Sequence, residues 1–159
     1  MPVVPRTILS FARDEQGDWV AQLDCGHRRH VRHRPPLSSF PWVEHAEGRA
    51  AHVGELIECG RCVSREWPEG FEPYKATKVF EQDTTPAGLL ADHRTKAGVW
   101  GRLELLEGSL ALRFVEPLDE RVELVAGDSA AIPPELPHRV ELSGPARFRV
   151  QFHRRSDAG

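Results

Sequence analysis

The chain has 159 residues, of which 40% are hydrophobic and 28% charged, with a formal net charge of −3. This composition excludes a disordered chain. Because the charges nearly balance, the molecule as a whole does not attract nucleic acid electrostatically. No apolar run approaches the roughly 20 residues that a membrane-spanning helix needs. The first residues lack the basic start and apolar stretch of a secretion signal, and the three cysteines are an odd number for a disulfide framework. We therefore expect a cytoplasmic protein without a membrane partner.

The composition divides near residue 70. All three cysteines and five of the eight histidines precede this point. The segment 66–73 contains prolines and a glycine, which interrupt any regular element. We therefore predict two domains, residues 1–70 and residues 71–156.

The first half gives few signals of regular structure. Trp19, Ala21 and Leu23 alternate with other residues and predict a strand that runs into a tight turn at 25–27. Prolines between residues 34 and 42 predict loop, and residues 44–54 have room for one short helix. Since so short a segment builds a thin core, we expect a metal to stabilise it.

The cysteines form two close-spaced ligand pairs. Cys59 and Cys62 make a C-x-x-C motif, and Cys25 and His27 flank a glycine. Two such pairs on tight turns are what a tetrahedral zinc site requires, and thiolate and imidazole suit zinc better than magnesium or calcium. A redox C-x-x-C would open a helix in a βαβ unit, which this sequence does not indicate. The sequence predicts a structural zinc in a zinc-ribbon-like module, with inert, reduced cysteines as the plainer alternative.

The sequence does not decide which histidine completes this site. His27 is the first candidate, and His30 or His33 is also within reach of the same turn. A closed site with four protein ligands has no position for a substrate, so we expect this zinc not to be catalytic.

A basic loop overlaps the first ligand pair. Together with Trp42 nearby, this loop indicates contact with a phosphate backbone or another anionic partner. The alternative is a solvated loop whose positive charge is offset by neighbouring acidic residues. The basic residues are Arg28, Arg29, Arg32 and Arg34.

The first half also resembles a small bacterial family of unknown function. This resemblance implies no activity. The matching residues are Leu23 to His27, His30 to His33, Pro35-Pro36, Pro41-Trp42, Arg49, Gly54, Cys59 and Cys62.

The second half alternates between apolar and polar residues over five short runs, at 99–105, 110–114, 122–124, 140–142 and 148–152. Turn residues separate these runs, beginning with Glu107-Gly108 between the first two. Short period-2 runs at regular spacing predict a small β-barrel.

Residues 127–138 fit the second cupin motif, G-x5-P-x-G-x2-H, except that Glu135 replaces its second glycine. His138 shares strand parity with Val140 and Leu142, so we expect it to face the interior. A buried imidazole needs a partner, either a metal ion or a hydrogen bond. The first cupin motif is degenerate: His93 is present, and Gly101 stands where the motif has its glutamate.

The second half resembles, more narrowly, the tellurite-resistance (TehB/YeaR-like) cupin family over residues 73–154. The matching residues are His93 to Gly101, Leu103, Glu107-Gly108 and Pro137 to Glu141. The resemblance implies a double-stranded β-helix, or jelly-roll barrel, with a metal pocket at His93 and His138. It also implies a role in tolerance of tellurite, other oxyanions or oxidative stress. Some members add a methyltransferase that this chain lacks, so methyl transfer to tellurium is not implied.

Further ligands in the barrel are weakly indicated. Glu104 is a third metal candidate, although it alternates away from Leu103 and Leu105. Lys96 is a candidate for binding an anion beside His93, or a surface lysine. His153 shares a face with polar residues of the last strand, so we expect it to face solvent. A pocket of hydrogen-bonded histidines without metal is the alternative.

Three functions follow from these patterns. The first is a zinc-stapled module fused to a stress-linked cupin that binds a small anion or a metal ion. The second is an oxygenase or isomerase using a divalent metal on His93 and His138. The third is a nucleic-acid or protein adaptor acting through the basic loop. Because cupins often pair, the resemblance also implies a homodimer as one assembly.

Overall fold

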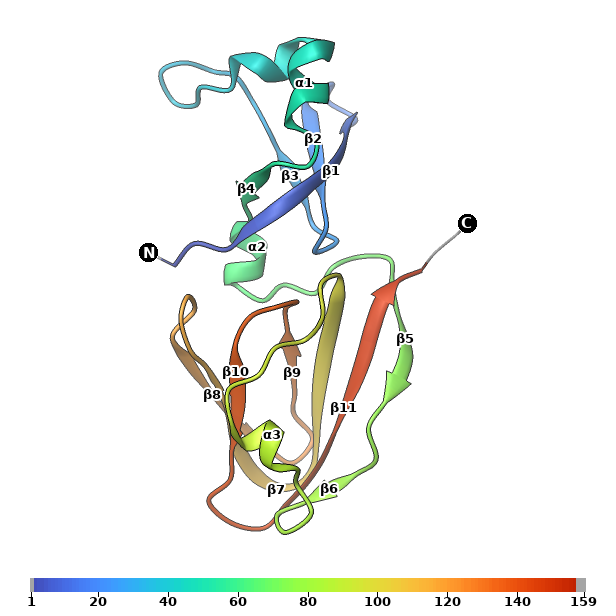
Figure 1. Cartoon of the computed structure of the whole chain (residues 1–159), viewed down its shortest axis with the longest axis vertical. Coiled ribbons are helices and arrows are strands. Elements are labelled where there is room, and N and C mark those ends of the chain that lie inside the picture. The colour runs from blue at the N-terminus through green and yellow to red at the C-terminus, as the bar shows by residue number, and fades with distance from the viewer. Residues whose placement is uncertain (1, 157–159) are drawn as a thin grey trace.

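The computed structural model describes residues 2–156, which form two β-sheets stacked along the long axis of the molecule (Figure 1). The N-terminal sheet has the strand order β3-β2-β1-β4. Its strands are β1 (Pro5–Arg13), β2 (Trp19–Leu23), β3 (Arg28–His30) and β4 (Leu56–Glu58). A 3-10 turn and two short helices accompany it: η1 (Pro41–Glu44), α1 (Ala46–His52) and α2 (Gly60–Val63). The expected strand at 19–23 and the expected short helix within 44–54 are both confirmed.

The turn after β2 places the first two site residues. The amide of Gly26 donates to the carbonyl of Leu23, and the amide of Leu23 donates to the carbonyl of His27, each at 3.0 Å. Gly26 has a φ of +95°, in the left-handed region that favours glycine. The turn therefore holds Cys25 and His27 on either side of a residue that only glycine fits well.

The C-terminal domain is a sheet of seven strands that curls into a barrel (Figure 1). Its strands are β5 (Phe71–Ala76), β6 (Phe80–Glu81), β7 (Val99–Phe114), β8 (Glu120–Val125), β9 (Ser129–Ile132), β10 (His138–Glu141) and β11 (Ala146–Arg155), and α3 (Ala87–Leu90) is its short helix. The long strand β7 pairs with β8, β9, β10 and β11, and every pairing in this sheet is antiparallel. The expected fold, a mainly β chain whose second half is a small β-barrel, is confirmed.

The prediction of a turn at Glu107-Gly108 is wrong, because both residues lie within β7, a single strand of 16 residues. Gly108 has a φ of +80°, and the register between β7 and β11 shifts between Arg147 and Phe148. The first part of β7 pairs with β9 and β11, and the part after Gly108 pairs with β8 and β10. A bulge and a glycine thus bend one strand so that it serves both walls of the barrel.

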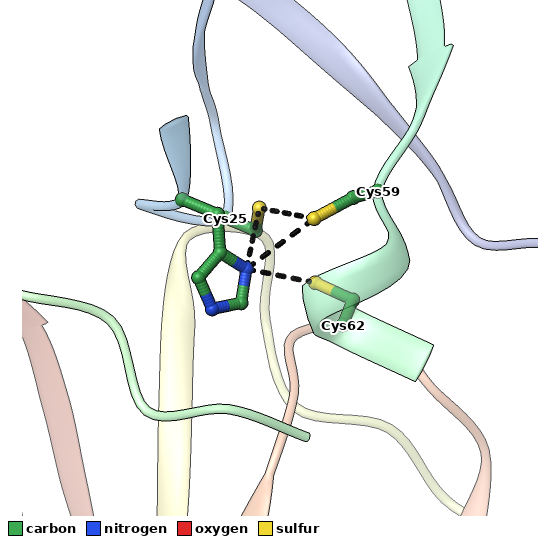
Figure 2. A group of neighbouring side chains, drawn as sticks. Cys25, Cys59 and Cys62 are labelled. Carbon is green, nitrogen blue, oxygen red and sulfur yellow. Dashed lines mark hydrogen bonds between the residues drawn. The ribbon is translucent and has the colours of Figure 1, made fainter. Parts of the chain in front are cut away.

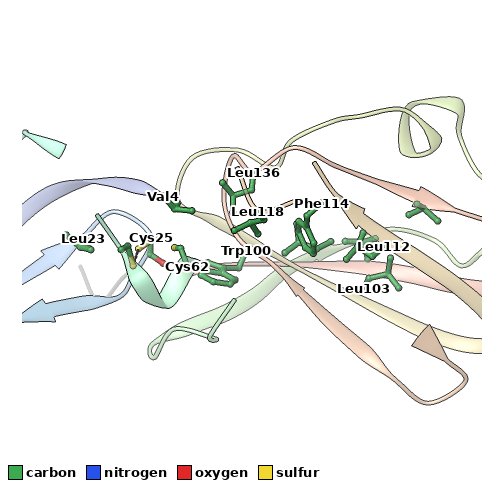
Figure 3. Packing of buried hydrophobic residues seen from close by; sticks show 14 of the residues in the cluster. Val4, Leu23, Cys25, Cys62, Trp100, Leu103, Leu112, Phe114, Leu118 and Leu136 are labelled. Carbon is green, nitrogen blue, oxygen red and sulfur yellow. Dashed lines mark hydrogen bonds between the residues drawn. The ribbon is translucent and has the colours of Figure 1, made fainter. Parts of the chain in front are cut away.

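The buried core continues from the N-terminal module into the barrel (Figure 3). Trp100, at the start of β7, is fully buried, and its indole Nε1 donates to the carbonyl of Cys25 at 2.7 Å. A Cβ on Gly26 would lie 2.4 Å from the ring of Phe71, so the two parts meet without a gap. Among the described residues, no helix is long and apolar enough to cross a membrane.

Candidate metal centre and barrel cavity

The three cysteines and one histidine come together from two separate turns (Figure 2). Cys25 and His27 lie in the hairpin turn between β2 and β3. Cys59 precedes α2, and Cys62 lies within it. All four side chains are buried, with 3% exposure or less.

The spacing of the four ligand atoms fits a tetrahedral ion. His27 Nδ1 lies 3.5 Å from Cys25 Sγ, 3.3 Å from Cys59 Sγ and 3.6 Å from Cys62 Sγ, and the Sγ atoms of Cys25 and Cys59 are 3.8 Å apart. Tetrahedral zinc, with sulfur at about 2.3 Å and nitrogen at about 2.0 Å, holds its ligand atoms about 3.5 to 3.8 Å from one another. These residues are therefore placed to bind a metal ion, consistent with zinc.

Hydrogen bonds around the centre orient its imidazole. His27 Nε2 donates to the carbonyl of Glu66 at 2.6 Å, which leaves Nδ1 directed at the sulfur atoms. Such a bond to the second ring nitrogen is the usual way in which a protein orients a ligating histidine. Burial lowers the pKa of His27, but hydrogen bonds to Cys25, Cys59 and the Glu66 carbonyl outweigh it and raise this pKa to about 10.

The thiols share negative charge. Hydrogen bonds from Cys25 and Cys62 lower the pKa of Cys59, whereas hydrogen bonds to Cys25 and Cys59, together with burial, raise the pKa of Cys62. The cluster thus favours a thiolate at Cys59, and thiolate is the form that binds metals.

Arg6 completes the surroundings of the centre, and the sequence analysis missed it. Its side chain is 4% exposed, and its Nε donates to Cys62 Sγ at 3.3 Å. Its terminal nitrogen donates to the carbonyl of Pro134, in the barrel, at 2.7 Å. Arg6 lies on the same face of its strand as Val4 and Ile8, which are both buried. An arginine that alternates in step with apolar residues was the sequence signal that could have identified it.

Of the three candidate histidines, only His27 meets the cysteines. His30 is exposed, and its Nε2 lies 2.8 Å from Asp14 Oδ2. His33 Nδ1 accepts a hydrogen bond from the amide of Phe40 at 3.0 Å. The structure therefore places neither alternative at the metal centre.

The basic loop is partly neutralised by an acidic residue. Arg32 and Arg34 both pair with Asp18, at 2.9 and 3.3 Å. The guanidinium of Arg29 lies 5.7 Å from the centre of the Phe40 ring. Arg28 lines a cleft of about 530 Å³ beside His27. Two of the four arginines thus share a single carboxylate.

Two further histidines face each other inside the barrel. The ring centres of His93 and His138 lie 4.2 Å apart, and their backbones form two hydrogen bonds of 2.9 Å. His93 Nδ1 donates to the carbonyl of Ala91 at 3.0 Å, and His138 Nδ1 donates to the carbonyl of Leu136 at 2.8 Å. Because a carbonyl only accepts, each neutral ring keeps its proton on Nδ1 and presents Nε2 as an acceptor.

These histidines line a small apolar cavity of about 100 Å³. Its walls include Leu103, Leu112, Ile132, Val140, Val150 and Phe152. Burial lowers the pKa of His138 to about 4, and the charge of His93 acts in the same direction against the Leu136 carbonyl. His138 is therefore neutral at pH 7.

The other candidates for the barrel lie outside this cavity. Glu104 pairs with Arg149 at 3.2 Å, and neither Glu104 nor the exposed Lys96 lines the cavity. Among the described residues, the only group of three or more metal-binding side chains is the N-terminal centre. The pair of histidines thus has no third protein ligand within the part of the chain that the structure describes.

The expectation that His153 faces solvent is wrong. It is 5% exposed, and its ring packs edge-on against Trp67 with the ring centres 4.7 Å apart. His153 lies on the outer face of β11, as its position in the alternating pattern predicts. The segment between the two domains, which contains Trp67, covers this end of the strand. Only the contact between domains buries it.

Comparison with protein families finds two separate matches. Residues 9–66 match a protein family of unknown function, DUF3565, and residues 75–150 match the TehB-like domain. Among curated proteins, no sequence matches this chain.

Solved structures similar to this chain match somewhat more than half of its length. A protein from Escherichia coli K12 is 24% identical, with a TM-score of 0.53, over 58% of this chain and 98% of its own. TehB from Haemophilus influenzae is 25% identical, with a TM-score of 0.49, over 55% of this chain and 32% of its own. A cupin-2 domain protein from Shewanella frigidimarina is 14% identical, with a TM-score of 0.37, over 56% of this chain and 74% of its own.

This chain therefore matches only about a third of the length of TehB. The E. coli protein, at 24% identity, shows the fold alone. Both resemblances expected from the sequence are confirmed. The chain joins a segment that matches DUF3565, residues 9–66, to a segment that matches the TehB-like domain, residues 75–150.

Proposed function

We propose that this chain is a cytoplasmic metal-binding protein of two domains, in which a structural zinc ion stabilises the N-terminal module. The observation that carries the proposal is the set of four buried ligand atoms at tetrahedral spacing. Zinc, when bound, supplies cross-linking of the two turns through Cys25, His27, Cys59 and Cys62. Since four protein ligands leave no open position, the role of the ion is structural.

The proposed role of the barrel is to bind a small anion or a divalent metal ion at His93 and His138. The two acceptor Nε2 atoms support the metal ion, since neutral imidazole is a metal ligand, whereas a small anion would require a proton on Nε2. The match to the TehB-like domain supports a cellular role in tolerance of tellurite, other oxyanions or oxidative stress.

Elemental analysis of the purified chain tests the metal centre. We expect one zinc ion per chain, lost in the Cys59→Ser variant and kept in the His138→Ala variant, which changes the barrel instead. A wild-type chain without metal after purification in zinc-supplemented medium would contradict the proposal.

A growth assay tests the cellular role. A strain lacking the chain should be more sensitive to tellurite, and the wild-type chain should restore growth better than the His138→Ala variant. Equal sensitivity with and without the chain would remove the stress role and leave the metal centre unaffected.

The two facing imidazoles also favour a second candidate, a metal-dependent cupin enzyme of oxygenase or isomerase type. Open coordination positions on such a metal would admit substrate. Anaerobic reconstitution with iron, manganese or nickel tests it: a second bound ion, lost in His138→Ala, is the expected result. A barrel that retains none of these metals would exclude this candidate.

A further inference from the structure

A buried arginine connects the metal centre to the barrel. Arg6 spans from the sulfur of Cys62, at 3.3 Å, to the carbonyl of Pro134, at 2.7 Å. Its only carboxylate neighbour among the described residues is Glu135, at 3.9 Å, and that side chain is 52% exposed. The principal partners of Arg6 are therefore the metal centre and one backbone carbonyl of the barrel.

The position of Arg6 depends on the state of the centre through Cys62. Zinc, when bound by three thiolates and a neutral imidazole, would give the centre a net charge of about −1. It would also fix Cys62 Sγ, to which Arg6 Nε donates at 3.3 Å, by cross-linking the two turns that carry the ligands. A buried guanidinium is stable only with a compensating charge or full hydrogen bonding, so an occupied centre gives Arg6 a fixed acceptor and a compensating charge.

The carbonyl that Arg6 holds belongs to the loop between two residues that line the barrel cavity, Ile132 and His138. Residues 133–137 lead directly into His138, and the carbonyl of Leu136 accepts the hydrogen bond that orients the His138 ring. The same loop is tied to Thr95, a cavity residue, because the amide of Glu135 donates to the Thr95 carbonyl at 3.1 Å. A shift of Pro134 therefore changes the surroundings of His138.

A second contact joins the same two sites. The indole of Trp100 donates to the carbonyl of Cys25, and the backbone of Gly26 packs against Phe71. Trp100 begins β7, which also contributes Leu103 and Leu112 to the cavity. The turn that carries Cys25 and His27 thus rests on the strand that lines the cavity.

We propose that metal occupancy of the N-terminal centre controls the conformation of the loop 133–137, through Arg6, and so regulates the two-histidine cavity. This inference rests on the proposed function, because it requires a metal at the centre. By linkage, a ligand in the cavity must in turn change the affinity of the centre for its metal by the same factor as the metal changes the affinity of the cavity.

Hydrogen exchange of the full chain, with zinc and after zinc removal by a chelator, tests the proposal at a temperature far below the unfolding transition, where amides exchange through local openings. We expect the amides of Glu135 and His138 to exchange about tenfold faster without zinc. The amides of Leu105 and Gly127, which are bonded to Asp128 and Leu105 respectively, report on the barrel away from the joint and should change little. Equal protection of the loop in both states would overturn the proposal, as would a uniform loss of protection across the barrel.

The zinc-loaded Arg6→Met variant separates the arginine from the metal. We expect it to retain one zinc ion per chain and to exchange its loop amides about tenfold faster than the wild type. Arg147→Met makes the same change at the opposite end of the barrel, where Arg147 pairs with Glu107, and should leave the loop unchanged. An unaltered loop in zinc-loaded Arg6→Met would exclude Arg6 as the connection.

The two proposals fail in different ways. A wild-type chain that binds no zinc overturns the metal centre and this inference together. A chain that binds one zinc ion but keeps the same loop protection in all states overturns this inference alone.

Discussion

Single residues of the β2–β3 turn decide which imidazole meets the cysteines. His27 is two residues from Cys25, across a glycine with positive φ, and its second nitrogen is bonded to the Glu66 carbonyl. His30 ends β3, where its side chain reaches Asp14 at the surface. The choice among neighbouring histidines therefore follows from backbone geometry, because all of them have the same ligand chemistry.

Replacing these histidines one at a time checks this choice. We expect His27→Ala to lower the zinc affinity by at least about tenfold, because a ligand is lost and the Glu66 carbonyl is left without its donor. His30→Ala, a matched change at the surface, should bind zinc like the wild type. A competition assay with a chromophoric chelator measures both affinities, and a greater loss in His30→Ala would contradict the assignment.

His138 should make the free energy of unfolding depend on pH. Its pKa is about 4 in the folded chain, below the ordinary histidine value of 6.5, so the unfolded chain binds more protons between these pH values. The stability contributed by His138 is complete above pH 6.5 and is lost as the pH falls toward 4. The charged or titratable groups that act on it are His93 and Asp92.

Urea unfolding at pH 7 and pH 5 measures this dependence. Between pH 7 and pH 5, the free energy of unfolding of the wild type should fall by on the order of 2 kcal/mol more than that of the His138→Gln variant, in which this position does not titrate. Parallel pH profiles for the two chains would show that His138 titrates normally in the folded state.

At the scale of elements, β7 organises the barrel. It is the strand that pairs with four neighbours, and Gly108 marks the bend between its two halves. A Cβ at Gly108 would lie 2.2 Å from the carbonyl oxygen of Pro145, which is backbone and cannot rotate away. The bend thus requires glycine for its dihedral angle and for its close approach to the neighbouring chain.

A pair of glycine substitutions separates these two requirements. Gly127 also has a positive φ, but a Cβ there meets no described atom within 4 Å. We expect Gly127→Ala to lower the free energy of unfolding by about 1 kcal/mol, because of the dihedral angle alone. Gly108→Ala should lower it by about 1 to 3 kcal/mol more, because its Cβ also clashes with the backbone. Chemical denaturation measures both, and equal losses would mean that the bend accommodates a side chain.

At the scale of the whole molecule, the metal centre lies at the joint between the two domains. The core runs without interruption from Leu23 and Cys25 through Trp100 to Phe114 (Figure 3). Arg65, just after α2, adds a further contact, with its guanidinium 3.2 Å from Glu120 and 5.1 Å from the centre of the Phe114 ring. The centre therefore ties the N-terminal module to the barrel as well as holding its own turns.

A continuous core of this kind should unfold in one cooperative step. We expect zinc release and the loss of β-structure to occur at the same temperature, and chelation of zinc to lower that temperature. Circular dichroism and a zinc-sensitive dye, recorded during the same thermal scan, compare the two events. Zinc release well before the barrel melts would show two independent units.

Local patterns were enough to predict much of this protein. Period-2 alternation predicted strands β7, β8, β10 and β11, because one face of each strand packs against the barrel interior. It did not predict β9. The metal ligands Cys25, Cys59 and Cys62 were predicted because ligand pairs on tight turns are a short-range feature. The break expected at Glu107-Gly108 failed because glycine in a strand bend and glycine in a turn look alike in sequence.

The features that only the tertiary structure decided all depend on residues far apart in the chain. The partners of Arg6 are 56 and 128 residues away, and the carbonyl that Trp100 binds is 75 residues away. Strand parity correctly placed His153 on the outer face of the barrel, and only the packing of Trp67 on that face buries it. By itself, the sequence determined the elements and the ligand chemistry, since both arise from neighbouring residues. Long-range packing, which no local pattern encodes, decided where the two parts of the chain meet and which residues surround the metal centre.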